Sequence, residues 1–314
     1  MKWYTGWRVR DAGLTGVALL LLLGALLLPS IDLPQDTYDY VIVFDITQSM
    51  NVEDYELDGV PASRLVFAKH SVRNALQHLP CGSRIGLGAF AEYRTVVTLA
   101  PVEVCGSYSD LLAALEKIDG RMRWGEASEV TKGVFWSMRA ARDLGTGTNV
   151  ILLTDGQEAP PLDATRPAVA IFDDLTSGAI GGWLVGVGGE VPRPIPKSDA
   201  EGNPRGYWRP HEVIQRATDP DGVARPSNEH LSSLHEAHLQ SLARQVGFQY
   251  ARLSDAESIE RTLRDSRFAT QLAVPTDLSW LPASLALLVL VIRFAPLPGS
   301  LREHALPRMS GFGD

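Results

Sequence analysis

One short stretch of the chain, residues 40–51, constrains the fold more than any other. It reads YVIVFDITQSMN, so that four apolar residues (41–44) lead directly into Asp45, and hydroxyl residues follow at Thr47 and Ser49. A short apolar run with β-branched residues is typical of a buried strand in a parallel sheet. Ligands of such sheets bind beyond the carboxyl ends of the strands. The stretch therefore predicts an α/β fold with these three polar residues at its binding edge.

The same three side chains offer a carboxylate and two neutral hydroxyls, which is an all-oxygen set. Such a set suits Mg²⁺ or Ca²⁺, which keeps some of its waters and an open position. We expect the acid to face the ion and not the core. An alternative stays open on these residues alone, because Asp, Thr and Ser after a strand commonly cap a helix or form a turn.

A second strand ends in a comparable way, and together the two stretches resemble a known family. The first stretch resembles the first loop of the metal-ion-dependent adhesion site of von Willebrand factor A domains. Residues 150–157 read VILLTDGQ, an apolar strand that ends in the T-D-G of the third loop of that site. The resemblance covers roughly residues 38–268. It implies that Asp155 is the third-loop acid and that a carboxylate from a protein partner takes the open position of the cation.

The second loop of the adhesion site has a fainter counterpart in residues 128–134, which read SEVTKGV. The resemblance implies that Ser128 supplies the hydroxyl ligand. Thr131 stands where the family usually has glycine, so it remains the alternative ligand. With Asp45, Thr47, Ser49 and Asp155 this completes the expected metal site. The motif contains no evident nucleophile–base pair, so we expect a binding module and not an enzyme.

The rest of residues 38–270 alternates between strand and helix patterns. Apolar residues recur at helical spacing in 64–79, 111–118, 130–144, 235–245 and 256–264, and strand patterns occupy 84–91, 95–99, 149–154, 182–187 and 248–253. Alternating β and α elements predict a mostly parallel sheet flanked by helices. The turn at 92–94 adds one antiparallel hairpin at the edge. This is the Rossmann-like arrangement that the resemblance to the A-domain family also implies.

Two apolar segments, 13–31 and 277–297, flank this domain and predict transmembrane helices. Basic residues lie on the outer side of each, which places the termini (1–12 and 298–314) in the cytoplasm by the positive-inside rule. Residues 38–270 are then exported, which for a bacterial inner-membrane protein means the periplasm. A cleaved signal peptide is the alternative for the first segment, and a buried helix is the alternative for the second.

The only two cysteines, Cys81 and Cys105, lie just outside the same end of the predicted hairpin. A bond between them would close a loop of about 25 residues and stabilise the fold by roughly 3 kcal/mol in the chain-entropy model. In an oxidising compartment we expect this disulfide to form. Two unrelated buried thiols are the alternative.

Residues 190–228 interrupt the pattern with seven prolines and predict a long insertion without regular structure. Tyr207 and Trp208 are its only large aromatic residues. They are candidates for contact with a partner, although they could equally attach the insertion to its own domain. The formal net charge of −8 argues against nucleic acid as a partner.

Several stretches resemble a narrower group, the MxaL proteins of methanol-oxidation gene clusters. They begin at Thr47 (TQSMNVEDY), Leu79 (LPCGS), Pro101 (PVEVC) and Thr154 (TDGQEAPP). The resemblance implies an accessory role in the assembly, activation or calcium loading of a periplasmic methanol dehydrogenase. An envelope scaffold or adhesion protein that works with a MoxR-type ATPase is an alternative, and a divalent-cation-dependent hydrolase is another.

Overall fold

The computed structural model describes residues 3–145, 147–162, 178–214 and 228–294, with side chains from residue 12 onward. The predicted cytoplasmic tail (298–314) and part of the predicted insertion (215–227) lie outside the described residues. The chain divides into two compact units. One unit comprises residues 35–272, and the other combines residues 1–34 with residues 273–314.

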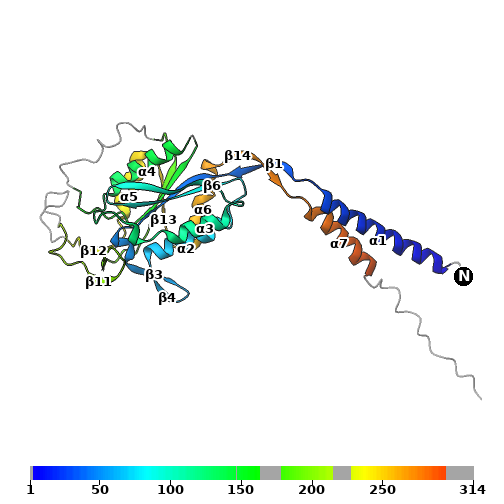
Figure 1. Ribbon diagram of the computed structural model, residues 1–314, viewed down its shortest axis with the longest axis horizontal. Helices are drawn as coiled ribbons and strands as arrows, with labels where there is room; N and C mark the ends of the chain where they lie inside the picture. The colour runs from blue at the N-terminus through cyan, green and yellow to red at the C-terminus, as the bar shows by residue number, and fades with distance from the viewer. Residues whose placement is uncertain (1–2, 146, 163–177, 215–227, 295–314) are drawn as a thin grey trace, which may run out of the picture. The chain divides into compact units, whose positions relative to one another are not determined.

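A six-stranded sheet forms the centre of residues 35–272 (Figure 1). Neighbouring strands run parallel except for the last pair, β5 and β6, which is antiparallel. In spatial order the strands are β13 (Gln249–Arg252), β8 (Gly182–Gly186), β7 (Asn149–Thr154), β2 (Asp39–Asp45), β5 (Arg84–Ala91) and β6 (Arg94–Glu103). The mostly parallel sheet and its antiparallel edge hairpin are confirmed.

Strand β2 is central because both of its faces are apolar. Tyr40, Ile42 and Phe44 pack on one side of the sheet, and Val41 and Val43 pack on the other. All five side chains are fully buried. Successive side chains of a strand point to opposite faces, so a continuous apolar run can serve two cores at once.

Helices cover both faces of the sheet. The first core contains apolar residues of α2 (Arg64–Leu76), α3 (Tyr108–Lys117) and α6 (Ala256–Leu263). The second core contains those of α4 (Val130–Leu144) and α5 (Glu236–Val246). The predicted helical ranges agree with these bounds, except that α2 ends at Leu76, three residues before the end of the apolar repeat.

The predicted insertion is not structureless in its described part. It contains β9 (Arg193–Pro194), β10 (Pro196–Ser198) and β11 (Pro204–Tyr207). Strand β10 pairs with β11, and β9 pairs with β12 (Leu231–Ser232). Proline lacks a backbone donor, so it is tolerated in short two-stranded ladders of this kind. The prolines predicted a loop because a proline pattern shows where regular structure is weakened. Such a pattern does not show where short strand pairs still form.

Smaller elements complete this unit. Strands β3 (Glu53–Leu57) and β4 (Val60–Ser63) form a hairpin that leads into α2. Short 3₁₀ helices lie in the described loops: η1 (Gln48–Asn51), η2 (Gly120–Met122) and η4 (Ser266–Phe268). Helix η1 follows β2 directly, so the residues after Asp45 turn tightly at the sheet edge.

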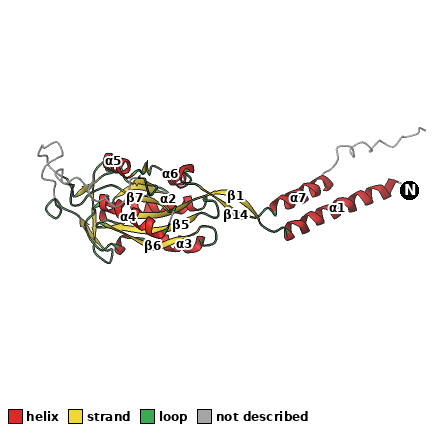
Figure 2. Ribbon diagram, turned by 90° about the horizontal axis from the view of Figure 1, so that it is seen from above, coloured by secondary structure: helices red, strands yellow, loops and turns green. Residues whose placement is uncertain are grey.

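The other unit contains two helices, α1 (Trp3–Leu27) and α7 (Trp280–Phe294), which lie side by side (Figure 2). Arg293 in α7 donates a hydrogen bond to Thr15 in α1. The paired strands β1 (Ile31–Thr37) and β14 (Thr270–Thr276) follow α1 and precede α7 in the chain. No helix in the described part of the chain is both long enough and apolar enough to cross a membrane, so the two predicted spans are not confirmed.

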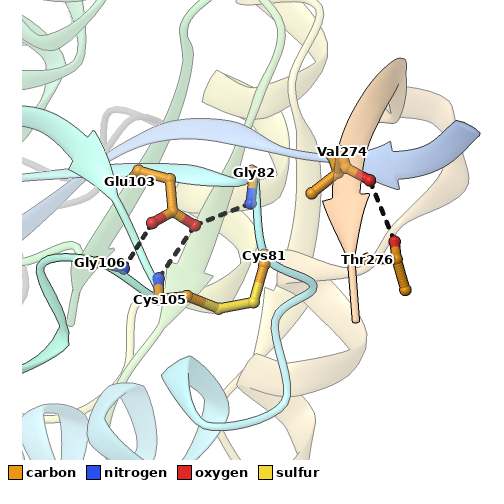
Figure 3. Close-up of a disulfide and its surroundings, with 7 residues drawn as sticks. All are labelled: Cys81, Gly82, Glu103, Cys105, Gly106, Val274 and Thr276. Atoms are coloured by element: carbon orange, nitrogen blue, oxygen red, sulfur yellow. Dashed lines mark hydrogen bonds between the residues drawn. A yellow bond between two sulfur atoms is a disulfide. The ribbon is translucent and has the colours of Figure 1, made fainter. Parts of the chain in front are cut away.

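The predicted disulfide joins Cys81 and Cys105, with 5.3 Å between their Cα atoms (Figure 3). Beside it, the Glu103 carboxylate accepts hydrogen bonds from the backbone N–H groups of Gly82 (2.8 Å), Cys105 (3.0 Å) and Gly106 (2.5 Å). Desolvation would raise the pKa of Glu103, but these three donors outweigh it and lower the pKa below its ordinary value of 4.5. The ionised carboxylate therefore joins the two segments that the disulfide links.

We expect Glu103→Gln to lower the free energy of unfolding by about 1 kcal/mol near neutral pH, because an amide replaces a carboxylate that accepts three hydrogen bonds. A lowered pKa in the folded state stabilises the fold above the unfolded value, and this contribution is lost as pH falls through the folded value. The difference between wild type and variant should therefore shrink as the pH falls below the ordinary pKa of 4.5. Denaturant unfolding across this range measures it, with Glu116→Gln on the exposed face of α3 as control. A difference that does not depend on pH would contradict the role given to Glu103.

We also expect residues 35–272 to fold without the other unit. Every side chain of the two hydrophobic cores belongs to this range. An oxidised fragment should unfold in one cooperative transition, measured by circular dichroism and by tryptophan fluorescence. Broad transitions that differ between the two probes would contradict this expectation.

Candidate functional site

Three loops meet at the carboxyl edge of the central sheet. Strands β2 and β7 are parallel neighbours, so Asp45 and Asp155 follow adjacent strand ends. Ser128 lies before α4 and pairs through its backbone with Ala159, with N–H···O distances of 2.7 Å in both directions. That pairing fixes the second loop to the segment after Asp155. The five residues predicted from the sequence therefore come from loops that lie together.

Asp45 is fully buried, and hydrogen bonds hold its carboxylate in place. One oxygen, Oδ1, accepts from the backbone N–H (2.9 Å) and the hydroxyl (2.6 Å) of Thr47, and Oδ2 accepts from the hydroxyl of Thr154 (2.6 Å). Burial and the neighbouring Asp155 carboxylate raise the pKa of Asp45 to about 7. Asp45 therefore also organises the loop that follows β2.

Three hydroxyl groups line one cavity of about 250 Å³ at this edge; they belong to Thr47, Ser49 and Ser128. All three residues are buried, and the hydroxyl oxygens of Thr47 and Ser49 are 3.2 Å apart. The Ser128 hydroxyl has no hydrogen-bond partner among the described residues. A buried hydroxyl without a partner is costly, so Ser128 has the character of a ligand group.

Thr131, the alternative to Ser128, forms hydrogen bonds with Glu158 instead. Its backbone N–H and its hydroxyl both donate to Oε1 of Glu158, at 2.9 and 2.7 Å. The Nε2 atom of His238 is 3.1 Å from the same oxygen. Thr131 does not line the cavity. This geometry favours Ser128 over Thr131 as the second-loop ligand.

Asp155 is also fully buried, and a buried arginine holds it. Nη1 of Arg64 donates to Oδ2 of Asp155 at 2.7 Å, and the Ser232 hydroxyl donates to the same oxygen at 2.7 Å. Oδ1 accepts from the backbone N–H of Gln157 at 3.0 Å. The third-loop acid is thus fixed in position, and its charge is offset by a guanidinium group.

Arg64 is the first residue of α2 and has no solvent exposure. Its other nitrogens contact the Asp54 carboxylate in the β3–β4 hairpin, with an Nη2–Oδ2 distance of 2.7 Å. Desolvation lowers the pKa of Arg64, but Asp155 and Asp54 outweigh it, so the pKa is raised. The guanidinium packs against Gly188, where φ is +129° and a Cβ atom would lie 2.8 Å from Nε of Arg64. Glycine is required here for both reasons.

These residues fit a hard divalent cation. The three hydroxyls could bind it directly, and Asp45 and Asp155 could act through water, because their oxygens already accept hydrogen bonds from protein groups. The unpartnered Ser128 hydroxyl and the raised pKa of Asp45 both indicate that the site favours added positive charge. An oxygen set of this kind is typical of Mg²⁺ or Ca²⁺ sites.

Sequence reasoning missed most of the groups that support the predicted ligands, namely Arg64, Asp54 and Ser232. Arg64 fell within the predicted range of α2, and nothing in the helical periodicity distinguishes a buried arginine from an exposed one. Thr154 was the exception, since it stands in the T-D-G stretch itself and its hydroxyl binds Asp45.

The two aromatic residues of the insertion behave differently. Nε1 of Trp208 donates to Oε1 of Gln48 at 3.0 Å, so Trp208 attaches the insertion to the first loop of the site. The Nζ atom of Lys197 lies 4.3 Å from the centre of the Trp208 ring. Tyr207 is 60% exposed. Only Tyr207 has the exposure expected of a pure surface contact, whereas Trp208 lines the cavity.

Comparison with known proteins agrees with this fold. Residues 40–157 match the von Willebrand factor type A domain. The chain therefore contains a von Willebrand factor type A domain. No curated protein sequence matches the chain.

The chain is similar to several solved structures. An aerotolerance-related membrane protein from Bacteroides fragilis is 21% identical with a TM-score of 0.51, and the match covers 72% of this chain and 96% of that one. A von Willebrand factor type A protein from Catenulispora acidiphila is 16% identical with a TM-score of 0.39, covering 79% and 42%. A mutant of the PilB minor pilin from Streptococcus sanguinis is 11% identical with a TM-score of 0.45, covering 81% and 63%.

We expect Ser128→Ala and Thr131→Ala to have opposite effects. Ser128→Ala should weaken Mg²⁺ binding by about tenfold or more and leave the free energy of unfolding nearly unchanged, because the hydroxyl has no protein partner. Thr131→Ala should lower the free energy of unfolding by about 1 kcal/mol, because Glu158 loses a hydroxyl donor. Calorimetric titration and denaturant unfolding of both variants measure these effects. Loss of Mg²⁺ binding in the folded Thr131 variant alone would reverse the assignment.

Proposed function

We propose that residues 35–272 form a metal-dependent protein-binding module. Asp45, Thr47, Ser49, Ser128 and Asp155 would hold Mg²⁺ or Ca²⁺, and a carboxylate of a partner protein would complete the coordination. The observation that carries this proposal is that three buried hydroxyl residues, Thr47, Ser49 and Ser128, line one cavity, where the Ser128 hydroxyl has no protein partner among the described residues. The buried carboxylates of Asp45 and Asp155 follow the adjacent strand ends.

The charge balance of the site supports a binding role. Arg64 offsets the charge of Asp155, so the ligand set carries less negative charge than two free carboxylates would. A bound cation would then supply a positive centre that attracts a further carboxylate. The neutral hydroxyls leave the positive charge of the cation largely uncompensated. An acidic side chain of a partner is the group that best neutralises this charge.

We propose binding and not catalysis as the role of this site. No histidine is among the described residues that line the cavity. The imidazole of His238 contacts Glu158. Thr131, which shares Glu158 with His238, does not line the cavity either. The described lining therefore offers hydroxyl and carboxylate oxygens without an adjacent imidazole base.

We propose further that the domain works outside the cytoplasm, anchored to the inner membrane of a bacterium, as an accessory factor for a periplasmic methanol dehydrogenase. The Cys81–Cys105 disulfide supports an oxidising compartment. The resemblance of four stretches to the MxaL proteins supports the partner. Co-purification of the dehydrogenase with the full chain in the presence of Ca²⁺, and its loss in chelator, would support this role. Co-purification that does not depend on the metal would contradict it.

We expect Asp45→Asn to abolish the response of the fold to divalent cations. Asparagine keeps the size of the side chain, and its amide can still bond to Thr47 and Thr154, so the fold should survive. In wild type, cation at one hundred times its Kd should stabilise the fold by about 2.7 kcal/mol. For a domain of this size that is a rise in Tm of roughly 5–10 °C.

Melting curves with and without Mg²⁺ or Ca²⁺ at matched ionic strength measure this response. Asp143→Asn, at an exposed position on α4, is the matched control and should respond as wild type does. An equal rise in Tm for wild type and Asp45→Asn would remove the proposed metal site.

A further inference from the structure

The cavity beside the proposed metal site has two chemically different sides. The polar lining contains the hydroxyl residues Thr47, Ser49 and Ser128, the amide residues Gln48 and Gln157, and the acidic residues Glu126, Glu212 and Glu229. Ile195, Trp208 and Ile214, all from the insertion, form an apolar wall. The volume of about 250 Å³ lies below the roughly 300–1,000 Å³ of typical small-molecule sites. One or two amino-acid side chains fit such a space.

A single residue, Gln48, fixes this apolar wall to the metal-site loop. Its Oε1 accepts from the backbone N–H of Ser198 (3.1 Å) and from Nε1 of Trp208 (3.0 Å). Its Nε2 donates to Oε2 of Glu126 at 2.6 Å. Gln48 lies between Thr47 and Ser49, so the wall and the proposed ligands are held by the same short segment. A ligand at the metal site would also contact the wall.

A third group points to the kind of ligand. Gln157 is 3% exposed and lines the cavity. Its Nε2 donates to the carbonyl oxygens of Glu229 (3.0 Å) and Leu231 (3.3 Å), which fixes the orientation of the amide. The Oε1 atom has no hydrogen-bond partner among the described residues. A buried amide oxygen requires a donor, and a backbone N–H of a bound peptide would supply one.

We propose that this site recognises an extended segment of a partner protein in which an acidic residue is followed directly by an aliphatic one. This inference rests on the proposed metal-dependent function and adds the specificity of the same site. The acidic side chain completes the cation's coordination beside Ser128. The N–H of the next residue donates to Oε1 of Gln157, and its aliphatic side chain packs against Ile195 and Trp208.

The apolar character and the size of the space select the aliphatic side chain. A basic side chain would lose its hydration against Ile195, Trp208 and Ile214. The carboxylates of Glu126 and Glu212 in the lining already accept hydrogen bonds from Gln48 and Lys197. The space of about 250 Å³ holds a carboxylate and an aliphatic side chain together. A leucine, isoleucine or valine side chain buries apolar surface without leaving a polar atom unpaired.

Fluorescein-labelled hexapeptides and the full chain in detergent test this proposal by fluorescence anisotropy. The reference peptide is Gly-Gly-Asp-Leu-Gly-Gly in the presence of Mg²⁺. Replacing its leucine by glycine should weaken binding about tenfold, from the lost apolar burial. N-methylation of the same leucine should weaken it about fivefold or more, because Gln157 loses its donor. Replacing aspartate by asparagine, or adding chelator, should abolish binding.

Two variants, Trp208→Ala and Ala127→Phe, test the apolar wall itself. The neighbouring aromatic residue Tyr207 provides the control. Trp208→Ala should remove the preference for leucine over glycine, whereas Tyr207→Ala should keep it, since Tyr207 does not line this cavity. Because Trp208→Ala could loosen the insertion, Ala127→Phe provides a second test, as it fills the cavity without removing a described contact. It should weaken the leucine peptide more than the glycine peptide.

The outcomes separate this inference from the proposed function. Mg²⁺-dependent binding of both aspartate peptides with equal affinity would overturn the acidic–aliphatic specificity and leave the metal-dependent function standing. Binding that ignores both Mg²⁺ and the aspartate would overturn the proposed function as well. Absence of any binding at millimolar peptide, in a protein that binds Mg²⁺ by calorimetry, would also overturn the specificity.

Discussion

The buried pair of Arg64 and Asp155 is the interaction on which the site depends. Two carboxylates, Asp45 and Asp155, are fully buried at adjacent strand ends. Removing a charge from water costs several kcal/mol per ion, and this cost is repaid only where the geometry is good and further hydrogen bonds are made. The guanidinium of Arg64 and the hydroxyls of Thr47, Thr154 and Ser232 compensate this cost. The loops can therefore present acidic groups without losing the fold.

The same arginine connects the site to distant parts of the chain. It begins α2, contacts Asp54 in the β3–β4 hairpin and reaches Ser232 in β12. Asp54 in turn accepts from the backbone N–H of Gly189 after β8. Segments far apart in sequence thus meet at one charged centre. Such a network is satisfied only when all of its members are in place, which makes the geometry of Asp155 specific.

The described part of the insertion belongs to the site as well. It adds an apolar wall beside hydroxyl groups that would otherwise face open solvent. Gln48 and Trp208 attach this wall to the loop after β2. The central sheet supplies the position of the proposed cation ligands, and the insertion supplies the shape of the space next to them. General affinity for a carboxylate and selectivity among partners would then come from different segments.

Much of the fold and the predicted ligands could be read from local sequence. The apolar run 41–44 is typical of a strand buried on both faces, because its residues have no polar side. The helical repeats of α4 and α5 show one apolar face each. The hairpin argument for Cys81 and Cys105 needed only strand lengths and a turn.

The hydrogen-bond partners of the site residues depend on distance in space and not on spacing in sequence. Arg64 reaches Asp155 across 91 positions, and Trp208 reaches Gln48 across 160. The choice between Ser128 and Thr131 likewise depended on Glu158, whose carboxylate accepts a hydrogen bond from the Thr131 hydroxyl.

The sequence by itself determined which groups stand at the strand ends, because strand periodicity is local. Only the tertiary structure decided how their charges are balanced and what lies beside them, because burial and pairing are set by residues from several loops at once.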